Sequence, residues 1–251
     1  MGVDDATDPA AAAARAVGLS VFGKLPPALL ERVLDDHRDV SVEQGYRFMG
    51  RDQPAPHRTG LVVSGLLRMY VESPDGRQIT FRYAGPGYFL GASTTVGRLN
   101  VQVAAGVEAV TAARVFYLNL DRLHALAQTE MKVAWALLDQ LVIYQRDLIH
   151  VLAGTAFGSI RQRVAMHLLT LGTTGPTTPR GPISVPVSQQ SLADAVGSTR
   201  ETVARALGEL RDAGLISTQR NRILLRSPES LAAEAHEATG AEPARTASRE
   251  S

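Results

Sequence analysis

The chain of 251 residues contains no cysteine, very little lysine and no long apolar run. Without cysteine it cannot hold an iron–sulfur cluster or a zinc ion on thiolates, and it has no thiol nucleophile. A cysteine-free chain is also typical of a reducing compartment. No apolar stretch approaches the ~20 residues that span a bilayer, and the acidic, alanine-rich N-terminus does not resemble an export signal. We therefore expect a cytoplasmic protein with no membrane contact.

Motifs of common enzyme classes are absent as well. The sequence has no P-loop, no G-x-S-x-G, no H-E-x-x-H and no G-x-G-x-x-G between a strand and a helix. We therefore expect no catalytic residue, no metal site and no certain cofactor. His57, His124 and His150 are candidates for a haem ligand, but a lone histidine is more often a structural residue.

Charge is unevenly distributed along the chain, although the formal net charge is only +1. Residues 155–227 carry nine arginines and four acidic residues, a net charge of +5, so the rest of the chain sums to −4. The only lysines in the chain are Lys24 and Lys132. A basic module on an acidic body predicts a polyanionic partner for that module.

The order of patterns along the chain predicts an α+β protein. Short apolar runs separated by Asp75–Gly76 and by Gly85–Gly87 indicate antiparallel strands in a sandwich or barrel. A long helical pattern follows, with a hinge expected near Gly154. The expected segments are a disordered N-terminus at 1–17, a mostly β domain at 18–128, one long helix at 129–154, a winged helix-turn-helix at 155–227, and a helix remnant with a disordered tail at 228–251.

The long helix carries apolar residues at alternating steps of three and four. A heptad seam of this kind predicts a partner helix, and therefore a homodimer. The alternative is that the seam packs onto its own domain, and Leu138, Val142 and Ile149 widen the apolar stripe enough for both. The seam residues are Ala134, Leu137, Leu141, Tyr144, Leu148 and Val151.

The stretch "SQQSLADAVGSTRETVARALGELRDAGLIS", from Ser188 to Ser217, fits a helix-turn-helix that begins at Gln189. The fifth position must be small because the two helices cross closely, and it is Ala193. The ninth must accept a positive φ, and it is Gly197. Apolar residues stand at the fourth, eighth and fifteenth positions, and "LISTQRNRILLRS" adds two strands of a wing. The combination predicts a DNA-binding module.

The start of the second helix carries the residues that would read bases. Ser198 is the expected N-cap, with Glu201 completing a capping box. An arginine such as Arg200 can donate two hydrogen bonds to guanine, and a glutamate can accept one from cytosine. The alternative is that Glu201 and Arg205, four residues apart, form a surface ion pair, or that Glu201 only caps the helix.

The segment "GSTRETVARALGELRDAGLIS" resembles the recognition helix of the cyclic-AMP receptor protein / fumarate-nitrate regulator (Crp/Fnr) superfamily. That resemblance assigns base contacts to Arg200, Glu201 and Arg205. It assigns the 18–128 segment to a cyclic-nucleotide-binding-like β-roll and the long helix to dimerisation. It implies a palindromic double-stranded DNA operator and offers RNA polymerase as a further partner. The expected phosphate contacts are Ser188, Gln190, Thr199, Thr202 and, on the wing, Arg220 and Arg222.

The nucleotide pocket departs from the pattern of that superfamily. Ala92 follows Gly91 where the superfamily has a glutamate, and Val103 and Ala104 stand where it has an Arg-Ser pair. Leu148 and Ile149 replace polar residues on the long helix. A buried cyclic phosphate without its arginine would lack a charge partner. These six residues mark the tentative effector pocket, and they argue against a cyclic AMP site of the family's type.

The residues leave three alternatives open. Arg82 and Arg98 are available for a different anion, although each is more often a surface residue. The winged module of a small-molecule-binding protein could instead mediate protein contacts. A last alternative keeps the DNA-binding function and makes the β-roll purely structural.

Overall fold

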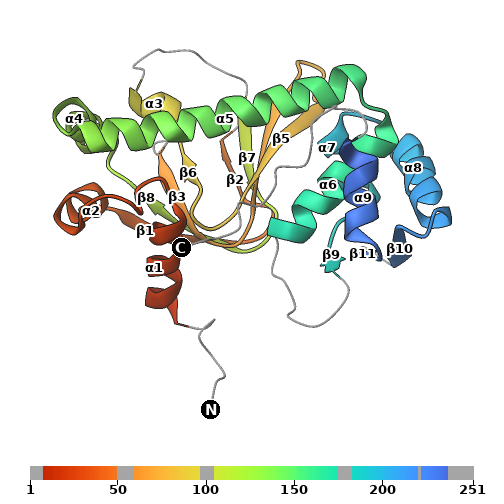
Figure 1. Ribbon diagram of the computed structural model, residues 1–251, viewed down its shortest axis with the longest axis horizontal. Coiled ribbons are helices and arrows are strands. Elements are labelled where there is room, and N and C mark those ends of the chain that lie inside the picture. The colour runs from red at the N-terminus through yellow and green to blue at the C-terminus, as the bar shows by residue number, and fades with distance from the viewer. Residues whose placement is uncertain (1–7, 50–58, 97–104, 175–182, 220–221, 237–251) are drawn as a thin grey trace, which may run out of the picture. The chain divides into compact units, whose positions relative to one another are not determined.

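The computed structural model describes residues 8–49, 59–96, 105–174, 183–219 and 222–236 (Figure 1). It divides the chain into two compact units, which meet in sequence between Leu148 and Ile149. The first unit contains the β-roll and the second contains the helix-turn-helix. Among the described helices, none is both long and apolar enough to cross a bilayer.

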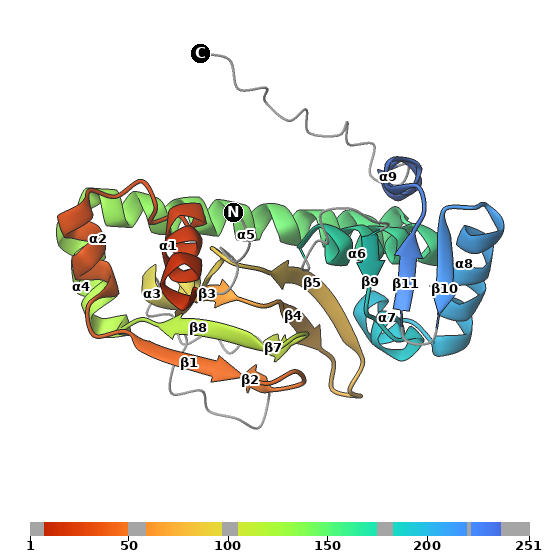
Figure 2. The same cartoon turned by 90° about the horizontal axis from the view of Figure 1, so that it is seen from below.

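Two four-stranded antiparallel sheets form the β-roll (Figure 2). Their strand orders are β1-β8-β3-β6 and β2-β7-β4-β5. The predicted antiparallel architecture is confirmed. The first sheet comprises β1 (Arg38–Val42), β8 (Ala113–Tyr117), β3 (Gly60–Ser64) and β6 (Phe89–Leu90). The second comprises β2 (Arg47–Met49), β7 (Ala105–Ala109), β4 (Leu67–Glu72) and β5 (Gln78–Ala84).

Two glycine turns join β3 to β4 and β4 to β5. The predicted hairpin between β4 and β5 turns at Gly76, which has φ +82°. Gly65, between β3 and β4, has φ +83°, and a Cβ there would lie 2.3 Å from the carbonyl oxygen of Ala112. Only glycine fits this second turn, because its neighbour on that side is backbone.

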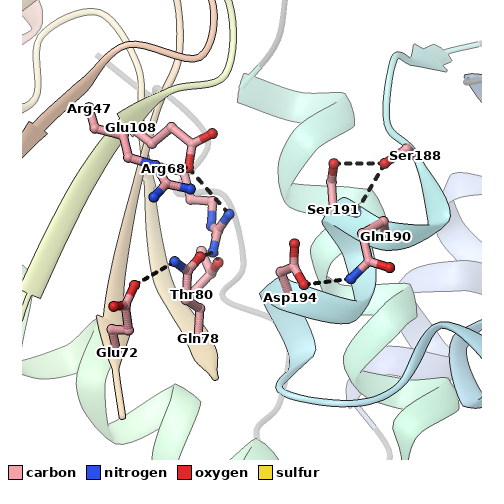
Figure 3. A network of polar contacts seen from close by, with 10 residues as sticks. All are labelled: Arg47, Arg68, Glu72, Gln78, Thr80, Glu108, Ser188, Gln190, Ser191 and Asp194. Carbon is pink, nitrogen blue, oxygen red and sulfur yellow. Dashed lines mark hydrogen bonds and ion pairs between the residues drawn. The ribbon is translucent and has the colours of Figure 1, made fainter. Parts of the chain in front are cut away.

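A buried arginine links three strands of the second sheet (Figure 3). Arg68 Nε donates to the Thr80 hydroxyl at 2.8 Å, and its guanidinium also donates to Gln78. The Glu108 carboxylate lies 3.7 Å from Arg68 Nη1. The arginine is thus matched by acceptors on β5 and β7, as a buried cation requires.

Helices pack around the roll and close its core. A short helix, α2 (Pro27–Leu34), begins at the second proline of the sequence "LPPALLERVLDDH". Phe22, Leu29 and Phe89 lie in one apolar cluster with residues of later helices. The other helices of this unit are α1 (Pro9–Leu19), α3 (Ala92–Val96), α4 (Leu120–Thr129) and the first part of α5 (Met131–Phe157).

The prediction of disorder at 1–17 is wrong over residues 9–17, which belong to α1. Asp8 caps this helix by accepting a hydrogen bond from the Ala10 N–H, and alanine is the strongest helix former. Ala16 and Val17 are buried against Leu61 of β3. An alanine-rich segment is therefore ordered here because the sheet supplies a surface on which it docks. Residues 1–7 lie outside the described part of the chain.

The predicted heptad seam of α5 faces its own domain over much of its length. Leu137 is 0% exposed and lies in the cluster around Phe22, and Leu141 packs against the same cluster. The Tyr144 ring meets Phe81 of β5 edge-on, with centroids 5.4 Å apart. The alternative of packing onto the same chain therefore holds for these three. Ala134 and Val151 are half-buried and Leu148 is exposed.

The second unit is a winged helix-turn-helix. Its sheet has the order β10-β11-β9, one strand more than the two predicted. Helix α5 continues through Gly154, and the helical path breaks at Gly158 and Ser159 instead. The elements are α6 (Ile160–Thr174), β9 (Ile183–Val185), α7 (Gln189–Val196), α8 (Arg200–Asp212), β10 (Ile216–Gln219), β11 (Arg222–Leu225) and α9 (Pro228–His236).

Gly65→Ala should lower the free energy of unfolding of the β-roll by about 3 kcal/mol, because it adds both a positive-φ strain and a clash with backbone. Gly45→Ala is the matched control, because Gly45 has φ +85° with nothing within 4 Å of a Cβ. It should cost only about 1 kcal/mol. Urea unfolding followed by circular dichroism compares the two, and equal losses would contradict the steric argument.

Candidate nucleic-acid interface

Helix α7 is the first helix of the helix-turn-helix, and every position required by the motif is met. Leu192, Ala193 and Val196 are buried, and Gly197 ends the helix in the left-handed region with φ +63°. Ser188 is its N-cap and accepts a hydrogen bond from the Ser191 N–H at 3.0 Å (Figure 3). The sequence assignment of this turn is therefore confirmed in its geometry.

The N-cap of α8 is Thr199 and not Ser198, so the predicted capping box is wrong. Thr199 Oγ1 accepts a hydrogen bond from the Thr202 N–H at 3.3 Å. The Ser198 N–H instead donates to the Ala193 carbonyl oxygen at 3.0 Å, closing the end of α7. The helix therefore begins at Arg200, and Glu201 lies within its first turn.

Helix α8 has one buried and one exposed face. Val203, Leu207 and Leu210 are buried in the unit, which fixes the rotation of the helix about its axis. Arg200, Glu201 and Arg205 all lie on the exposed side. Among the residues that the structure describes, Glu201 and Arg205 form no ion pair. The surface-pair alternative is therefore not realised, and both side chains are available to a ligand.

The Glu201 carboxylate is held in its ionised form. Its own backbone N–H and the Thr199 hydroxyl lower the pKa of this carboxyl, and the positive charge of Arg200 lowers it further. An ionised carboxylate is an acceptor only. It can therefore accept a hydrogen bond from an exposed base amine such as cytosine N4.

The predicted phosphate contacts lie at helix starts and on the wing. Ser188 and Thr199 cap α7 and α8, where unpaired backbone N–H groups favour an anion. The Gln190 amide donates to Asp194 at 2.9 Å, which orients the side chain one turn along α7 (Figure 3). Arg222 is exposed at the start of β11. Thr202 is half-buried, and Arg220 lies outside the described residues.

Sequence reasoning missed the residue that connects α6 to the turn. Arg163 Nη1 donates to the Val196 carbonyl oxygen at 2.8 Å, at the end of α7 where the helix dipole favours a cation. Desolvation lowers the pKa of this guanidinium. Arg161, also on α6, pairs with Glu234 of α9 at 2.9 Å. No local pattern signals these contacts, because the partners are 33 and 73 residues away.

Four residues of the predicted effector pocket, Gly91, Ala92, Leu148 and Ile149, are among the described residues. Ala92 is buried at the start of α3, directly after Gly91 with φ +84°. Leu148 and Ile149 are exposed on α5. Val103, Ala104, Arg98 and His57 lie outside the described residues. Of the other haem candidates, His124 Nδ1 lies 2.8 Å from the Thr95 carbonyl oxygen, and His150 is exposed.

Comparison with known domain families defines the class of protein. Residues 162–234 match the Crp-like helix-turn-helix domain. Residues 40–130 match the cyclic nucleotide-binding domain. The chain therefore pairs a cyclic nucleotide-binding type of β-roll with a DNA-binding helix-turn-helix, as the sequence resemblance predicted.

Individual relatives agree with this pairing. The transcriptional regulator LdrP of Thermus thermophilus is 35% identical over 172 residues, which cover 68% of this chain and 84% of that protein. The CRP-like cAMP-activated global transcriptional regulator of Mycobacterium tuberculosis is 24% identical over 218 residues, 84% of this chain and 94% of that one. The crystal structure of a CRP/FNR-family transcriptional regulator, also from Thermus thermophilus, matches with TM-score 0.61 and 26% identity, covering 80% of this chain and 100% of that one. The chain belongs to the Crp/Fnr family of transcriptional regulators.

Thr199→Ala should lower the free energy of unfolding of the helix-turn-helix unit by about 1 kcal/mol, because it removes the N-cap of α8. Ser198→Ala is the adjacent control and should change it by only a few tenths of that value, because the Ser198 side chain does not cap the helix. Urea unfolding of the full chain, fitted to two transitions, measures both. A larger loss of unfolding free energy for Ser198→Ala than for Thr199→Ala would support the capping box predicted from the sequence.

Proposed function

We propose that this protein is a homodimeric, sequence-specific DNA-binding transcription regulator that reads a palindromic operator. The proposal rests on the exposure of Arg200, Glu201 and Arg205 on one face of α8, in its first two turns. The opposite face is locked into the unit, so the three side chains have a fixed direction. Membership of a family of transcriptional regulators supports a regulatory role rather than an enzymatic one.

Each base contact follows from the hydrogen-bonding groups of the side chain. Arg200 and Arg205 each donate in a fork to O6 and N7 of a guanine, and Glu201 accepts from N4 of a cytosine. Ser188, Gln190, Thr199, Thr202, Arg220 and Arg222 contact phosphates. The phosphate contacts position α8 in the major groove, and the base contacts supply discrimination between sequences.

We infer that the homodimer uses a different face of α5 from the one predicted. An apolar stripe lies on the outside of the helix, with Trp135 60% exposed and Val142 63% exposed. Its residues follow steps of four and three, the heptad spacing that favours a two-stranded coiled coil. The stripe, here called the outer seam, consists of Met131, Trp135, Leu138, Val142, Gln145, Ile149 and Leu152.

The apolar side chains of the outer seam are exposed in the single chain, as expected for a surface that a second chain covers. Exposed large apolar side chains in a continuous row are uncommon on a monomer and mark contact surfaces. Pairing two copies along α5 would bury this row and bring together two copies of the recognition helix, one for each half-site of an operator whose half-sites lie about 34 Å apart, one turn of DNA. A twofold dimer of this kind requires a palindromic operator.

The β-roll is proposed not to bind cyclic AMP in the manner of the cAMP-activated relatives. Ala92 supplies no carboxylate at the position after the Gly91 turn, and its side chain is buried. A cyclic nucleotide therefore lacks a polar partner that the resemblance leads us to expect there. No cofactor is assigned to this protein.

Arg200→Ala should flatten the preference for guanine at one operator position, with about 1–3 kcal/mol of discrimination lost. Arg222→Ala should weaken binding to all sequences alike. It should also reduce by about one the slope of the logarithm of the DNA-binding constant against the logarithm of the salt concentration. Arg122→Ala, in the first unit, is the control and should leave DNA binding unchanged. Selection from a randomised operator library at several salt concentrations measures all three. Retention of wild-type discrimination by Arg200→Ala would overturn the assignment of base contacts.

Val142→Glu should convert the dimer into a monomer at micromolar concentration, because it puts like charges together in the centre of the outer seam. Leu19→Glu replaces another exposed apolar residue, 73% exposed at the end of α1, and should leave the dimer intact. Sedimentation velocity distinguishes the two states. A dimeric Val142→Glu variant would exclude this face as the interface.

A further inference from the structure

An ion pair between β5 and α5 lies in the first unit, away from the DNA-binding helix in sequence. Arg82 Nη1 donates to both oxygens of the Asp147 carboxylate, at 2.8 and 2.9 Å. The Asp147 side chain is only 10% exposed and the Arg82 side chain 30% exposed. Arg82 lies inside the segment that matches the cyclic nucleotide-binding domain, and Asp147 lies outside it. The sequence analysis names Arg82 as a candidate to bind an anion, and in the structure the Asp147 carboxylate is bound to it.

Aromatic and amide groups surround this pair. The Arg82 guanidinium carbon lies 4.9 Å from the centroid of the Tyr88 ring, a cation–π distance. Burial raises the pKa of Tyr88, so its hydroxyl stays protonated. Gln140 and Tyr144 precede Asp147 on α5 by seven and three residues, so the three lie on one face of the helix. The Gln140 amide lies beside the Tyr88 hydroxyl.

Two buried donors in this cluster have no well-aligned acceptor among the residues that the structure describes. They are Arg82 Nε and Gln140 Nε2, and Gln140 is only 3% exposed. A buried donor without an acceptor is unfavourable, and native structures contain few of them. The Asp147 carboxylate thus leaves Arg82 Nε without an acceptor, and Gln140 Nε2 has only the poorly aligned Tyr88 hydroxyl beside it. A small anion with several acceptor oxygens would use them more fully.

We propose that Arg82, Tyr88 and Gln140 form a binding site for a small carboxylate or phosphate group, and that the Asp147 carboxylate is its resident ligand. Because Asp147 belongs to α5, its carboxylate occupies the site without any diffusible anion. A free anionic effector must displace Asp147, and in doing so it would release this turn of α5 from β5. The proposal concerns regulation and stands independently of which bases α8 reads.

The position of Asp147 explains why such a contact would matter. It precedes by one residue the Leu148–Ile149 boundary at which the chain passes from the first unit to the second. The inner face of α5 is held to the roll by apolar packing around Leu137 and by Tyr144 on Phe81. The ion pair is the last of these described contacts along the helix before the boundary. A carboxylate bound to Arg82 therefore decides whether this turn of α5 stays on the roll.

Chemical rescue tests the proposal. Asp147→Ala removes the resident carboxylate and leaves Arg82 as a partly buried cation without a partner, so the melting temperature of the β-roll should fall by about 5–10 °C. Sodium formate has the size of the deleted group. At about ten times its dissociation constant it should restore roughly 3 °C of that loss, saturably, and more than sodium chloride at the same ionic strength. Inorganic phosphate, tested in parallel, shows whether the site also accepts the larger oxyanion.

The controls separate a built anion site from a general salt effect. Wild-type protein should show no formate-specific rise, because Asp147 occupies the site. The double variant Arg82→Gln/Asp147→Ala should show none either, because the cation is gone. Equal effects of formate and chloride on Asp147→Ala, or an equal formate effect on the double variant, would overturn the proposal.

A second variant keeps the test decisive if Asp147→Ala does not fold. Asp147→Asn preserves the shape of the side chain and removes only the charge, so its melting temperature should also fall by several degrees. A variant as stable as wild type would show that Arg82 does not depend on a carboxylate, and the proposal would fail. Because melting is measured without DNA, this result is independent of whether the chain reads an operator.

Discussion

The proposed DNA-reading surface depends on the close crossing of α7 and α8. The crossing needs a small side chain at Ala193 and a left-handed turn at Gly197, and both are present. Once Val203 and Leu210 are buried, the rotation of α8 is fixed, and the side chains opposite to them must point outward. Arg200 and Arg205 thus stand on the surface because apolar residues on the other side of the helix are held in the core. The packing of the apolar face of α8 therefore sets the direction of the side chains that are proposed to read bases.

Helix α5 has to satisfy two surfaces at once. Its inner face carries Leu137 and Tyr144 onto the roll, and its outer face carries Trp135 and Val142 to solvent. A helix that is apolar on two sides cannot bury both against a single domain. The roll therefore takes one side, and the other is left for a second chain in the proposed dimer. The Arg82–Asp147 pair belongs to the inner side, so the proposed regulation through it and the proposed association through the outer side would use separate faces of one element.

Much of the fold follows from local sequence patterns, and the exceptions have physical causes. The hairpin at Gly76 and the turn at Gly197 were predicted because a positive φ at glycine is a local requirement. Helix α1 was missed because its order depends on Leu61, which lies more than forty residues away. The sequence assigns the inner face of α5 to a dimer seam, whereas Leu137 and Tyr144 pack onto the roll, because apolar spacing does not reveal which of two stripes meets the sheet. Ser198 and Thr199 are both good capping residues, and the hydrogen bond from Ser198 to Ala193 decides between them.

The site is less predictable than the fold, since its contacts join distant parts of the chain. Arg163 reaches the end of α7 and Arg82 reaches α5, and neither contact leaves a trace in the spacing of nearby residues. The single polar member of the outer seam, Gln145, has a consequence of another kind. If two copies slid along each other by one heptad, each amide would face hydrocarbon instead of its twin. In the proposed dimer that mismatch would disfavour shifted alignments and keep the two chains in register, so that one twofold axis relates them.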